Sequence, residues 1–304
     1  FDSYADTGKT GNDVILALGP GAVDIGVNGF LNAGIERIDA TGAGGPARVL
    51  DTDNGDKLDF SGVTLIGAIT LDGAGGNDTI TGSSAADTIH GGKGDDQLNG
   101  GQNGDTYIVS GLSGGSFEGF DRYQDAGGTG TDLIAAVGTA GVDIGVRGFS
   151  AACGIERFDL SGAGGPVRLL DAGGGNTVDL SGVQILGGNF AAIVAGNGGD
   201  RITATAGADS IRGGTGNDTL AGGVGNDTLS GGKGNDIFVL GANNGDDVVT
   251  DFKSGIDKLD LSSVGSAGLS FSAVGDHTLL TYSGGTVELL GVPPGKILLS
   301  DLIL

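Results

Sequence analysis

Nine aspartates stand in two runs, and within each run consecutive members are nine residues apart. This spacing constrains the fold more than any other feature of the chain. Glycine-rich turns precede most of the aspartates, such as GGTGND from Gly213 to Asp218, and a large apolar residue follows two positions later. The pattern G-G-x-G-x-D-x-U-x, in which U is that apolar residue, is typical of a parallel β-roll. The U positions hold Ile80, Ile89, Leu98, Tyr107, Ile202, Ile211, Leu220, Leu229 and Phe238.

The nine-residue period also predicts metal sites. A six-residue turn and a three-residue strand make half a coil, so aspartates two repeats apart stack on the same side of successive coils. Neighbouring strands lie about 4.8 Å apart, and Ca²⁺ takes about six to eight oxygen ligands. We therefore expect several Ca²⁺ ions, about five or more, each held between two stacked turns. The expected pairs are Asp78/Asp96, Asp87/Asp105, Asp200/Asp218, Asp209/Asp227 and Asp218/Asp236.

Each coil places only two apolar side chains inside, and stacked carboxylates repel one another without a cation. We therefore expect the coils to be disordered until calcium binds. A flexible glycine-rich linker would have a similar composition, but it would not keep aspartates and apolar residues in phase.

Three turns are imperfect: GSSAAD ends at Asp87, ATAGAD ends at Asp209, and the turn before Asp105 has Asn103 where glycine is expected. We expect weaker binding there, above all between Asp87 and Asp105.

Composition narrows the function classes. The chain has 38 acidic and 15 basic residues and a net charge of −23, which disfavours nucleic acid and anionic membranes because both require basic clusters. No apolar stretch is long enough to span a membrane, and the first residues lack the features of a secretory signal peptide. Cys153 is the single cysteine, so no internal disulfide can form and calcium is the candidate stabiliser.

A long duplication organises the chain. VDIGVNGF (Val23 to Phe30) matches VDIGVRGF (Val142 to Phe149), and the segments that follow each of them match in the same order. We expect an all-β, right-handed parallel β-roll or β-solenoid with a C-terminal β cap. The expected domains are 1–119 with a nonapeptide run at 73–108, 120–240 with a run at 195–239, and a cap at 241–304. Because the chain starts inside the recurring pattern without methionine, we expect it to be the C-terminal part of a longer protein.

Three further segments accompany the nonapeptides: the run exit from Asp236 to Leu240, the TDFxxGxDxLDL segment from Thr250 to Leu261, and the terminus from Asp301 to Leu304. Together they resemble the RTX family of type I secreted bacterial proteins, over roughly half of the chain. The resemblance implies export of the unfolded chain by a type I secretion machinery of a Gram-negative bacterium. It also implies an uncleaved C-terminal signal and folding outside the cell on calcium binding. Alternatively, the terminal segment is only a last capping strand.

The resemblance also implies a ligand set. Side-chain ligands would be Asp78, Asp87, Asp96, Asp105, Asp200, Asp209, Asp218, Asp227 and Asp236, and backbone carbonyl ligands would come from Gly92, Gly94, Gly214, Gly216, Gly223, Gly225, Gly232 and Gly234. Asp132 ends a single isolated turn that fits the pattern, and Asp13 ends a turn that fits it only loosely. Both are weaker candidates for calcium ligands. A glycine–aspartate turn without metal is the alternative at both positions.

No catalytic site is visible in the sequence, so we expect the chain not to be an enzyme, although a catalytic domain could precede it. His90 and His277 are expected to face solvent, and neither G-x-S-x-G nor H-E-x-x-H occurs. Two interpretations of function remain. The first is part of a surface-layer, adhesin or matrix protein that assembles with itself. The second is an export and folding module of a secreted protease, lipase or polysaccharide epimerase, which could contact cell-surface polysaccharide through bound calcium.

Overall fold

The computed structural model describes the whole chain except residues 1–11, 32–33, 112–116, 126–128 and 189. The described residues form β-strands and turns, with two short 3-10 helices, η1 (Ala151–Cys153) and η2 (Leu299–Asp301), and no α-helix. Within this described part, no helix has the length and apolar character needed to cross a membrane. The expectation of an all-β fold is therefore confirmed.

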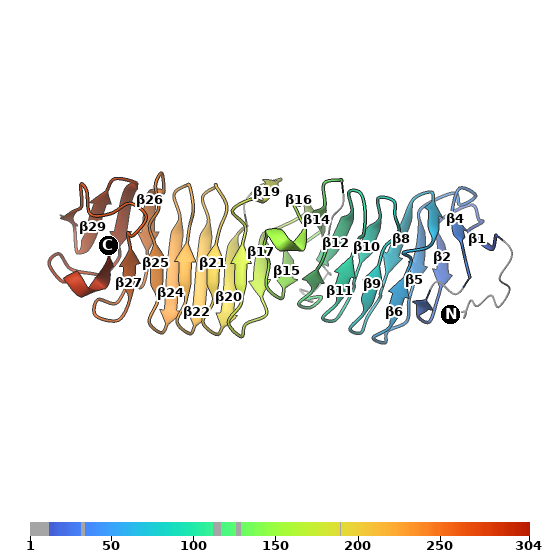
Figure 1. Ribbon diagram of the computed structural model, residues 1–304, viewed down its shortest axis with the longest axis horizontal. Helices are drawn as coiled ribbons and strands as arrows, with labels where there is room; N and C mark the ends of the chain where they lie inside the picture. Colours follow the sequence, from blue (N-terminus) through green and yellow to red (C-terminus); the bar gives the residue numbers. More distant parts are fainter. Residues whose placement is uncertain (1–11, 32–33, 112–116, 126–128, 189) are drawn as a thin grey trace. The chain divides into compact units, whose positions relative to one another are not determined.

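The chain divides into two compact units. Unit 1 comprises residues 1–146, 151–165 and 185–187, and unit 2 comprises residues 147–150, 166–184 and 188–304. Within each sheet, the strands outside the C-terminal cap lie side by side in sequence order (Figure 1). The expected division at residue 120 does not coincide with this one, because unit 1 extends through the start of the second sequence duplicate.

Unit 1 consists of parallel sheets that are joined by turns. Its largest sheet has the order β19-β16-β14-β12-β10-β8-β5-β2, and two smaller sheets have the orders β13-β11-β9-β6-β3 and β1-β4-β7. The strands are β1 (Val14–Leu16), β2 (Val23–Gly26), β3 (Phe30–Leu31), β4 (Arg37–Asp39), β5 (Ala47–Leu50), β6 (Lys57–Asp59), β7 (Thr64–Ile66), β8 (Ile69–Asp72), β9 (Thr79–Thr81), β10 (Thr88–His90), β11 (Gln97–Asn99), β12 (Thr106–Gly111), β13 (Arg122–Tyr123), β14 (Leu133–Gly138), β15 (Val142–Val146), β16 (Arg157–Ala163) and β19 (Gln184–Leu186).

Strand register gives the length of each coil in unit 1. Thr70, Thr88 and Thr106 are paired in sequence order, so each of these coils contains two nonapeptides, as the aspartate spacing predicts. The preceding coil is longer, because Arg48 pairs with Thr70. The following coil is longer still, because Thr106 pairs with Leu133. The segments outside the nonapeptide runs therefore form parallel coils that continue the roll, as expected.

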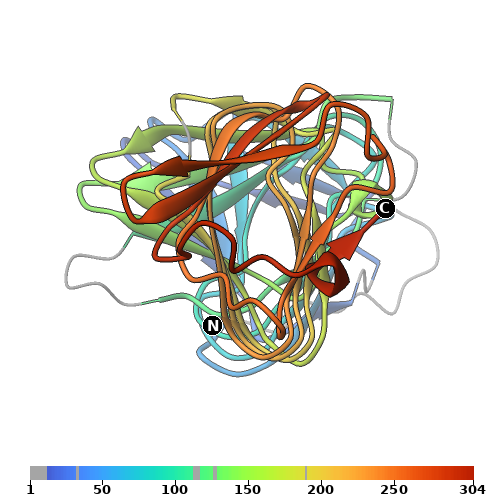
Figure 2. The ribbon, with the colours of Figure 1, turned by 90° about the vertical axis from the view of Figure 1, so that its left-hand side faces the viewer.

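Unit 2 repeats this construction. Parallel strands form one sheet with the order β17-β20-β22-β24-β26-β30 and a second with the order β18-β21-β23-β25-β27-β31. Viewed from the end, its coils overlie one another, with strands on two sides and turns between them (Figure 2). The strands are β17 (Val167–Asp171), β18 (Thr177–Asp179), β20 (Ala192–Asn197), β21 (Arg201–Thr203), β22 (Ser210–Thr215), β23 (Thr219–Ala221), β24 (Thr228–Lys233), β25 (Ile237–Val239), β26 (Gly245–Val249), β27 (Lys258–Asp260), β30 (Gly285–Leu289) and β31 (Leu302–Ile303).

The apolar side chains at the U positions form the core between the facing sheets. Each of the nine is at most 2% exposed. Tyr107 extends the core of unit 1 through an edge-on contact with Tyr123, whose ring centroid lies 5.4 Å away. Alternate residues of each short strand point outward, which follows from the period of two in a β-strand. The sequence pattern therefore identified the inward-facing positions correctly.

A β cap follows the last nonapeptide coil of unit 2. Strands β28 (Ser270–Val274), β29 (His277–Tyr282) and β30 form an antiparallel meander, and β30 also pairs in parallel with β26. The terminal strand β31 pairs with β27 through Leu302 and Leu259. Because these strands cover the unpaired edge of the last coil, they confirm the expected cap. An additional role of the terminus as an export signal stays a prediction.

Glycine is required in the turns because successive coils touch there. Gly216 has a φ of +139°, and a Cβ atom at this position would lie 1.5 Å from the carbonyl oxygen of Gly198 in the preceding coil. Gly94 is similar, with a φ of +131° and a clash at 1.5 Å with the oxygen of Gly76. The turn glycines therefore set the close stacking of the coils as well as the shape of each turn.

We expect the Gly216→Ala variant to lose roughly 2–4 kcal/mol of unfolding free energy, because it combines backbone strain with a steric clash. Gly182→Ala is the matched control, because a Cβ there meets nothing within 4 Å and the backbone is not in the left-handed region. Urea unfolding of both variants at saturating calcium measures the difference. Equal stability of the two variants would contradict the role assigned to coil contact.

Candidate metal centres

The repeat aspartates occupy the turns that join the two sheets of each roll. All nine are buried, with at most 5% of each residue exposed. Within a run, the turns alternate between the two edges of the roll because each coil has two turns. Consecutive aspartates of a run therefore lie at opposite edges, and every second one lies at the same edge.

A hydrogen bond links each stacked pair of aspartates. The backbone N–H of one aspartate donates to Oδ1 of the aspartate in the next coil, at 2.8 Å from Asp78 to Asp96 and 3.0 Å from Asp218 to Asp236. All five pairs expected from the sequence make this contact: Asp78/Asp96, Asp87/Asp105, Asp200/Asp218, Asp209/Asp227 and Asp218/Asp236. The structure thus brings together the residues that the repeat spacing predicted. We call these columns of stacked carboxyl groups the aspartate ladders.

The second carboxylate oxygen of most ladder residues is buried and lacks a hydrogen-bond partner. Among the described residues, this holds for Oδ2 of Asp78, Asp96, Asp105, Asp200, Asp218, Asp227 and Asp236. A buried carboxylate oxygen without a donor is costly. A divalent cation would satisfy these atoms, and carboxylate and carbonyl oxygens are the donors that Ca²⁺ prefers. The residues present therefore fit calcium.

Burial changes the acidity of the ladder carboxyl groups. Desolvation, together with the charge of neighbouring carboxylates, raises the pKa of Asp78 and Asp105 to about 7 and that of Asp218 to about 6. Hydrogen bonds from backbone amides act in the opposite direction but are outweighed. Without a cation, these buried carboxyl groups are therefore harder to ionise than carboxyl groups in solvent. A bound divalent cation reverses this preference because it favours the charged form.

The first glycine of each turn makes room for the unpartnered oxygen. A Cβ atom on Gly91 would lie 2.3 Å from Oδ2 of Asp96, and one on Gly222 would lie 2.0 Å from Oδ2 of Asp227. The carboxylate therefore folds back over its own turn. The eight glycines expected to offer carbonyl ligands all have a positive φ, from 96° to 142°: Gly92, Gly94, Gly214, Gly216, Gly223, Gly225, Gly232 and Gly234. Ligation through their carbonyl oxygens stays a prediction.

The comparisons with known proteins agree with this geometry. The family model described as "RTX calcium-binding nonapeptide repeat (4 copies)" matches residues 72–107, 194–229 and 213–249, which contain all nine aspartates. This chain carries RTX calcium-binding nonapeptide repeats. These RTX repeats imply calcium binding.

Among solved structures, the extracellular lipase LipA from Serratia marcescens is similar, with 18% sequence identity and a TM-score of 0.26. The similarity covers 73% of this chain and 40% of the lipase chain, so this chain spans less than half of that protein. Among curated proteins, none matches this chain.

Two RTX aspartates differ from the other seven, and both end imperfect turns. Oδ2 of Asp87 accepts a hydrogen bond from the backbone N–H of Ser83, whose hydroxyl donates to Oδ1. Oδ2 of Asp209 accepts hydrogen bonds from the backbone N–H and the hydroxyl of Thr205. In these two turns a protein donor therefore bonds to Oδ2, the oxygen that, within the described chain, has no partner in the other seven repeat aspartates. The hydroxyl residue gives a physical reason for the weaker calcium binding expected at these turns.

Asn103 occupies the glycine position of the third imperfect turn and adopts a φ of +71°, as expected from the tolerance of asparagine for this conformation. Its side-chain amide donates to the carbonyl oxygen of Ser84 in the preceding coil. The turn therefore keeps the RTX backbone shape despite the substitution, and Asp105 at its end retains an unpartnered Oδ2.

The ladders continue beyond the RTX runs. In unit 1, Oδ1 of Asp121 accepts the amide of Asp96, and Oδ1 of Asp132 accepts the amide of Asp105. In unit 2, the amide of Asp227 bonds to Asp247 and that of Asp236 bonds to Asp257. The nine-residue period missed Asp121, Asp247 and Asp257 because the coils that contain them are longer than two nonapeptides. A search for aspartates just before short apolar strands would have found them.

The two weaker sequence candidates have different surroundings. Asp132 is buried and lies on the ladder directly after Asp105, which places it as predicted beside a repeat aspartate. Asp13 is half-buried, and its amide donates to Oε2 of Glu36. Metal binding by either residue stays a prediction.

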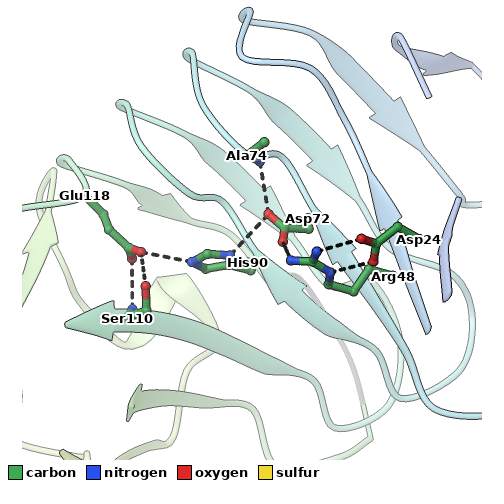
Figure 3. Close-up of polar contacts among 7 residues, drawn as sticks. All are labelled: Asp24, Arg48, Asp72, Ala74, His90, Ser110 and Glu118. Atoms are coloured by element: carbon green, nitrogen blue, oxygen red, sulfur yellow. Dashed lines mark hydrogen bonds and ion pairs between the residues drawn. The ribbon is translucent and has the colours of Figure 1, made fainter. Parts of the chain in front are cut away.

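His90 points outward, as expected, but it is only partly exposed to solvent. Its side chain is 21% exposed, and it lies in a row of alternating charges across one face of the largest sheet of unit 1 (Figure 3). Nδ1 lies 3.2 Å from Asp72 Oδ1 and Nε2 lies 2.9 Å from Glu118 Oε1. Asp72 also contacts Arg48, which makes two 2.9 Å hydrogen bonds with Asp24. The row connects adjacent strands β2, β5, β8 and β10 because their outward residues are in register.

The two carboxylates keep His90 protonated. Burial by itself would lower the pKa of His90, but the hydrogen bonds to Asp72 and Glu118 raise it to about 10. His277 has a different environment: its Nδ1 accepts the backbone N–H of Gly291 at 2.9 Å, and its side chain is 31% exposed, as expected at the surface.

We expect the Asp218→Asn variant to bind fewer calcium ions than the wild type, because the side-chain NH₂ replaces an oxygen that faces two stacked turns. Asp209→Asn should keep the ion count, because Thr205 already occupies the equivalent oxygen. Native mass spectrometry or equilibrium dialysis with calcium measures the ion count of each folded variant. Equal losses from both variants would contradict the distinction between the two kinds of turn.

We expect His90 to stabilise unit 1 in a pH-dependent manner. Since its folded pKa of about 10 exceeds the ordinary value of 6.5, the contribution is complete below pH 6.5 and is lost as the pH rises toward 10. His90→Gln should therefore cost about 1.5–3 kcal/mol near pH 6.5 and progressively less above it. Urea unfolding of both proteins from pH 6.5 to 10 at fixed calcium measures the difference. A difference that does not change with pH would count against the charged histidine.

Proposed function

We propose that this chain is a calcium-dependent folding region of a secreted protein. The observation that carries the proposal is that, in the described part of the chain, seven of the nine repeat aspartates have a buried oxygen without a hydrogen-bond partner. They recur at stacked positions in both RTX runs. A fold that repeatedly buries such atoms needs an external partner for them, and a hard divalent cation is the partner that fits.

The energetics support folding outside the cell. A calcium site of the extracellular type has a Kd of about 10⁻⁴ M, so about 1 mM Ca²⁺ stabilises the folded state by ~1.4 kcal/mol per site. Five such sites give ~7 kcal/mol, which is comparable to the stability of a whole domain. At the sub-micromolar calcium of a cytosol this contribution is close to zero. The chain would then stay unfolded for export by a type I secretion machinery and fold in the extracellular medium of a Gram-negative bacterium.

We further propose that the region is structural, as part of a surface-layer, adhesin or matrix protein. The two sequence duplicates use the same contacts: the amide of Gly29 bonds to Oδ1 of Asp51 in unit 1, and the amide of Gly148 bonds to Oδ1 of Asp171 in unit 2. Coils built from a repeated plan can be added without a new core, which suits an extended scaffold. The proposal assigns no catalytic role to this chain.

We expect removal of calcium by excess chelator to abolish most of the β signal in circular dichroism and to make the chain sensitive to protease. Readdition of Ca²⁺ should restore both, whereas Mg²⁺ should not, because Mg²⁺ requires shorter and more regular coordination. Full β structure in chelator would overturn the proposed function.

Electron microscopy of the refolded chain tests the structural role separately. Ordered sheets or filaments that form on calcium addition would support it. A protein that stays monomeric at high concentration would instead favour the export and folding module of a secreted enzyme.

A further inference from the structure

The first RTX run ends in a coil that differs from the coils before it. Thr88 pairs with Thr106 two nonapeptide lengths further along the chain, whereas Thr106 pairs with Leu133 at a separation of three such lengths. The additional residues carry Asp125 and Asp132, and they bring both side chains next to Asp105. One carboxylate oxygen from each of the three residues lies within 4.8 Å of the others. All three residues are buried, with at most 4% exposed.

Each of the three carboxyl groups is held by a protein donor. Oδ1 of Asp105 accepts the amide of Asp87 at 2.7 Å, and Oδ1 of Asp132 accepts the amide of Asp105 at 2.7 Å. Oδ2 of Asp125 accepts the hydroxyl of Tyr107 at 3.0 Å. The remaining oxygens of Asp105 (Oδ2) and Asp125 (Oδ1) have no hydrogen-bond partner in the described residues. Two deeply buried, unpartnered oxygens therefore belong to the same cluster.

The position of Asp125 is fixed from two sides. The hydroxyl of Tyr107 accepts the backbone N–H of Gly100 at 2.6 Å, which orients it to donate to Asp125. The backbone N–H of Asp125 donates to the carbonyl oxygen of Cys153 at 2.8 Å. In the folded chain, these contacts therefore hold the Asp125 carboxylate in place beside Asp105.

The cluster has an excess of negative charge. Glu156 accepts the amide of Asp132 at 2.8 Å and adds a fourth carboxyl group nearby. Desolvation raises the pKa of Asp125 and of Asp132, and the charge of Glu156 raises both further. These groups would repel one another if all were ionised without a cation.

We propose that Asp105, Asp125 and Asp132 form a separate calcium site that closes the first RTX run. The donor set, one carboxylate oxygen from each of three buried aspartates, suits Ca²⁺, a hard cation that takes oxygen ligands in flexible geometry. The site goes beyond the proposed function because Asp125 belongs to no nonapeptide. It also gives Asp105 a cation partner on the side away from Asp87, whose own carboxylate is held by Ser83.

Terbium luminescence tests the site on the whole chain. Tb³⁺ is a hard cation that takes oxygen ligands, and its emission on ultraviolet excitation requires an aromatic ring close by. The chain has no tryptophan and four tyrosines, so Tyr107, which bonds to the ligand Asp125, is the expected antenna. Asp125→Asn should remove one bound ion per chain, and Tyr107→Phe should at least halve the part of the emission that depends on Asp125.

Tyr282→Phe is the control, because it removes the tyrosine of unit 2 and should leave that part of the emission unchanged. An Asp125→Asn variant with the wild-type ion count and emission would overturn the site. If Asp125→Asn fails to fold in calcium, Tyr107→Phe decides: lower emission at an unchanged ion count supports the site, and unchanged emission overturns it. If only this test fails while Asp218→Asn still loses calcium, the proposed function stands without the additional site.

Discussion

One contact between neighbouring coils underlies the rest of the structure: the amide of one aspartate bonds to a single carboxylate oxygen of the aspartate above it. The contact sets the register of the coils, because it fixes which residue lies over which. It also gives the two carboxylate oxygens different roles: Oδ1 accepts a backbone hydrogen bond, and Oδ2 faces the turn. In the folded coils, a carboxylate held in this way is oriented toward the position that a cation would take.

The same ladder is completed in two ways. In regular RTX turns, Oδ2 of the aspartate has no hydrogen-bond donor in the described chain. Burying this charged oxygen is costly unless a cation binds it. In other turns a protein group provides the donor, as Thr205 does for Asp209 and the amide of Asn244 does for Asp247. Stability therefore depends on calcium in the regular turns and on protein donors in turns such as those of Asp87, Asp209 and Asp247.

The sequence predicted the fold and the repeat aspartates because one short period governs both. Because a coil contains two nonapeptides, Asp218 stacks on Asp236, which lies two repeats later. The same repeat points Leu220 into the core. Prediction failed where the coil length changes. Asp125 was missed because the lengthened coil has no period from which to find it. His90 was expected in solvent, but two carboxylates from other coils cover it. Nothing in the local sequence of His90 indicates either neighbour.

The sequence by itself determined the parallel all-β roll, the buried apolar positions and the stacking of the repeat aspartates, because each follows from a fixed spacing along the chain. Only the tertiary structure decided which carboxylate oxygens stay without a partner, since that depends on donors such as Ser83 and Tyr107 and on the exact path of their turns. It also decided that Asp105, Asp125 and Asp132 meet. The repeat spacing predicts which residues are neighbours in coils of regular length. In a coil of irregular length, the neighbouring residues can be identified only from the folded structure.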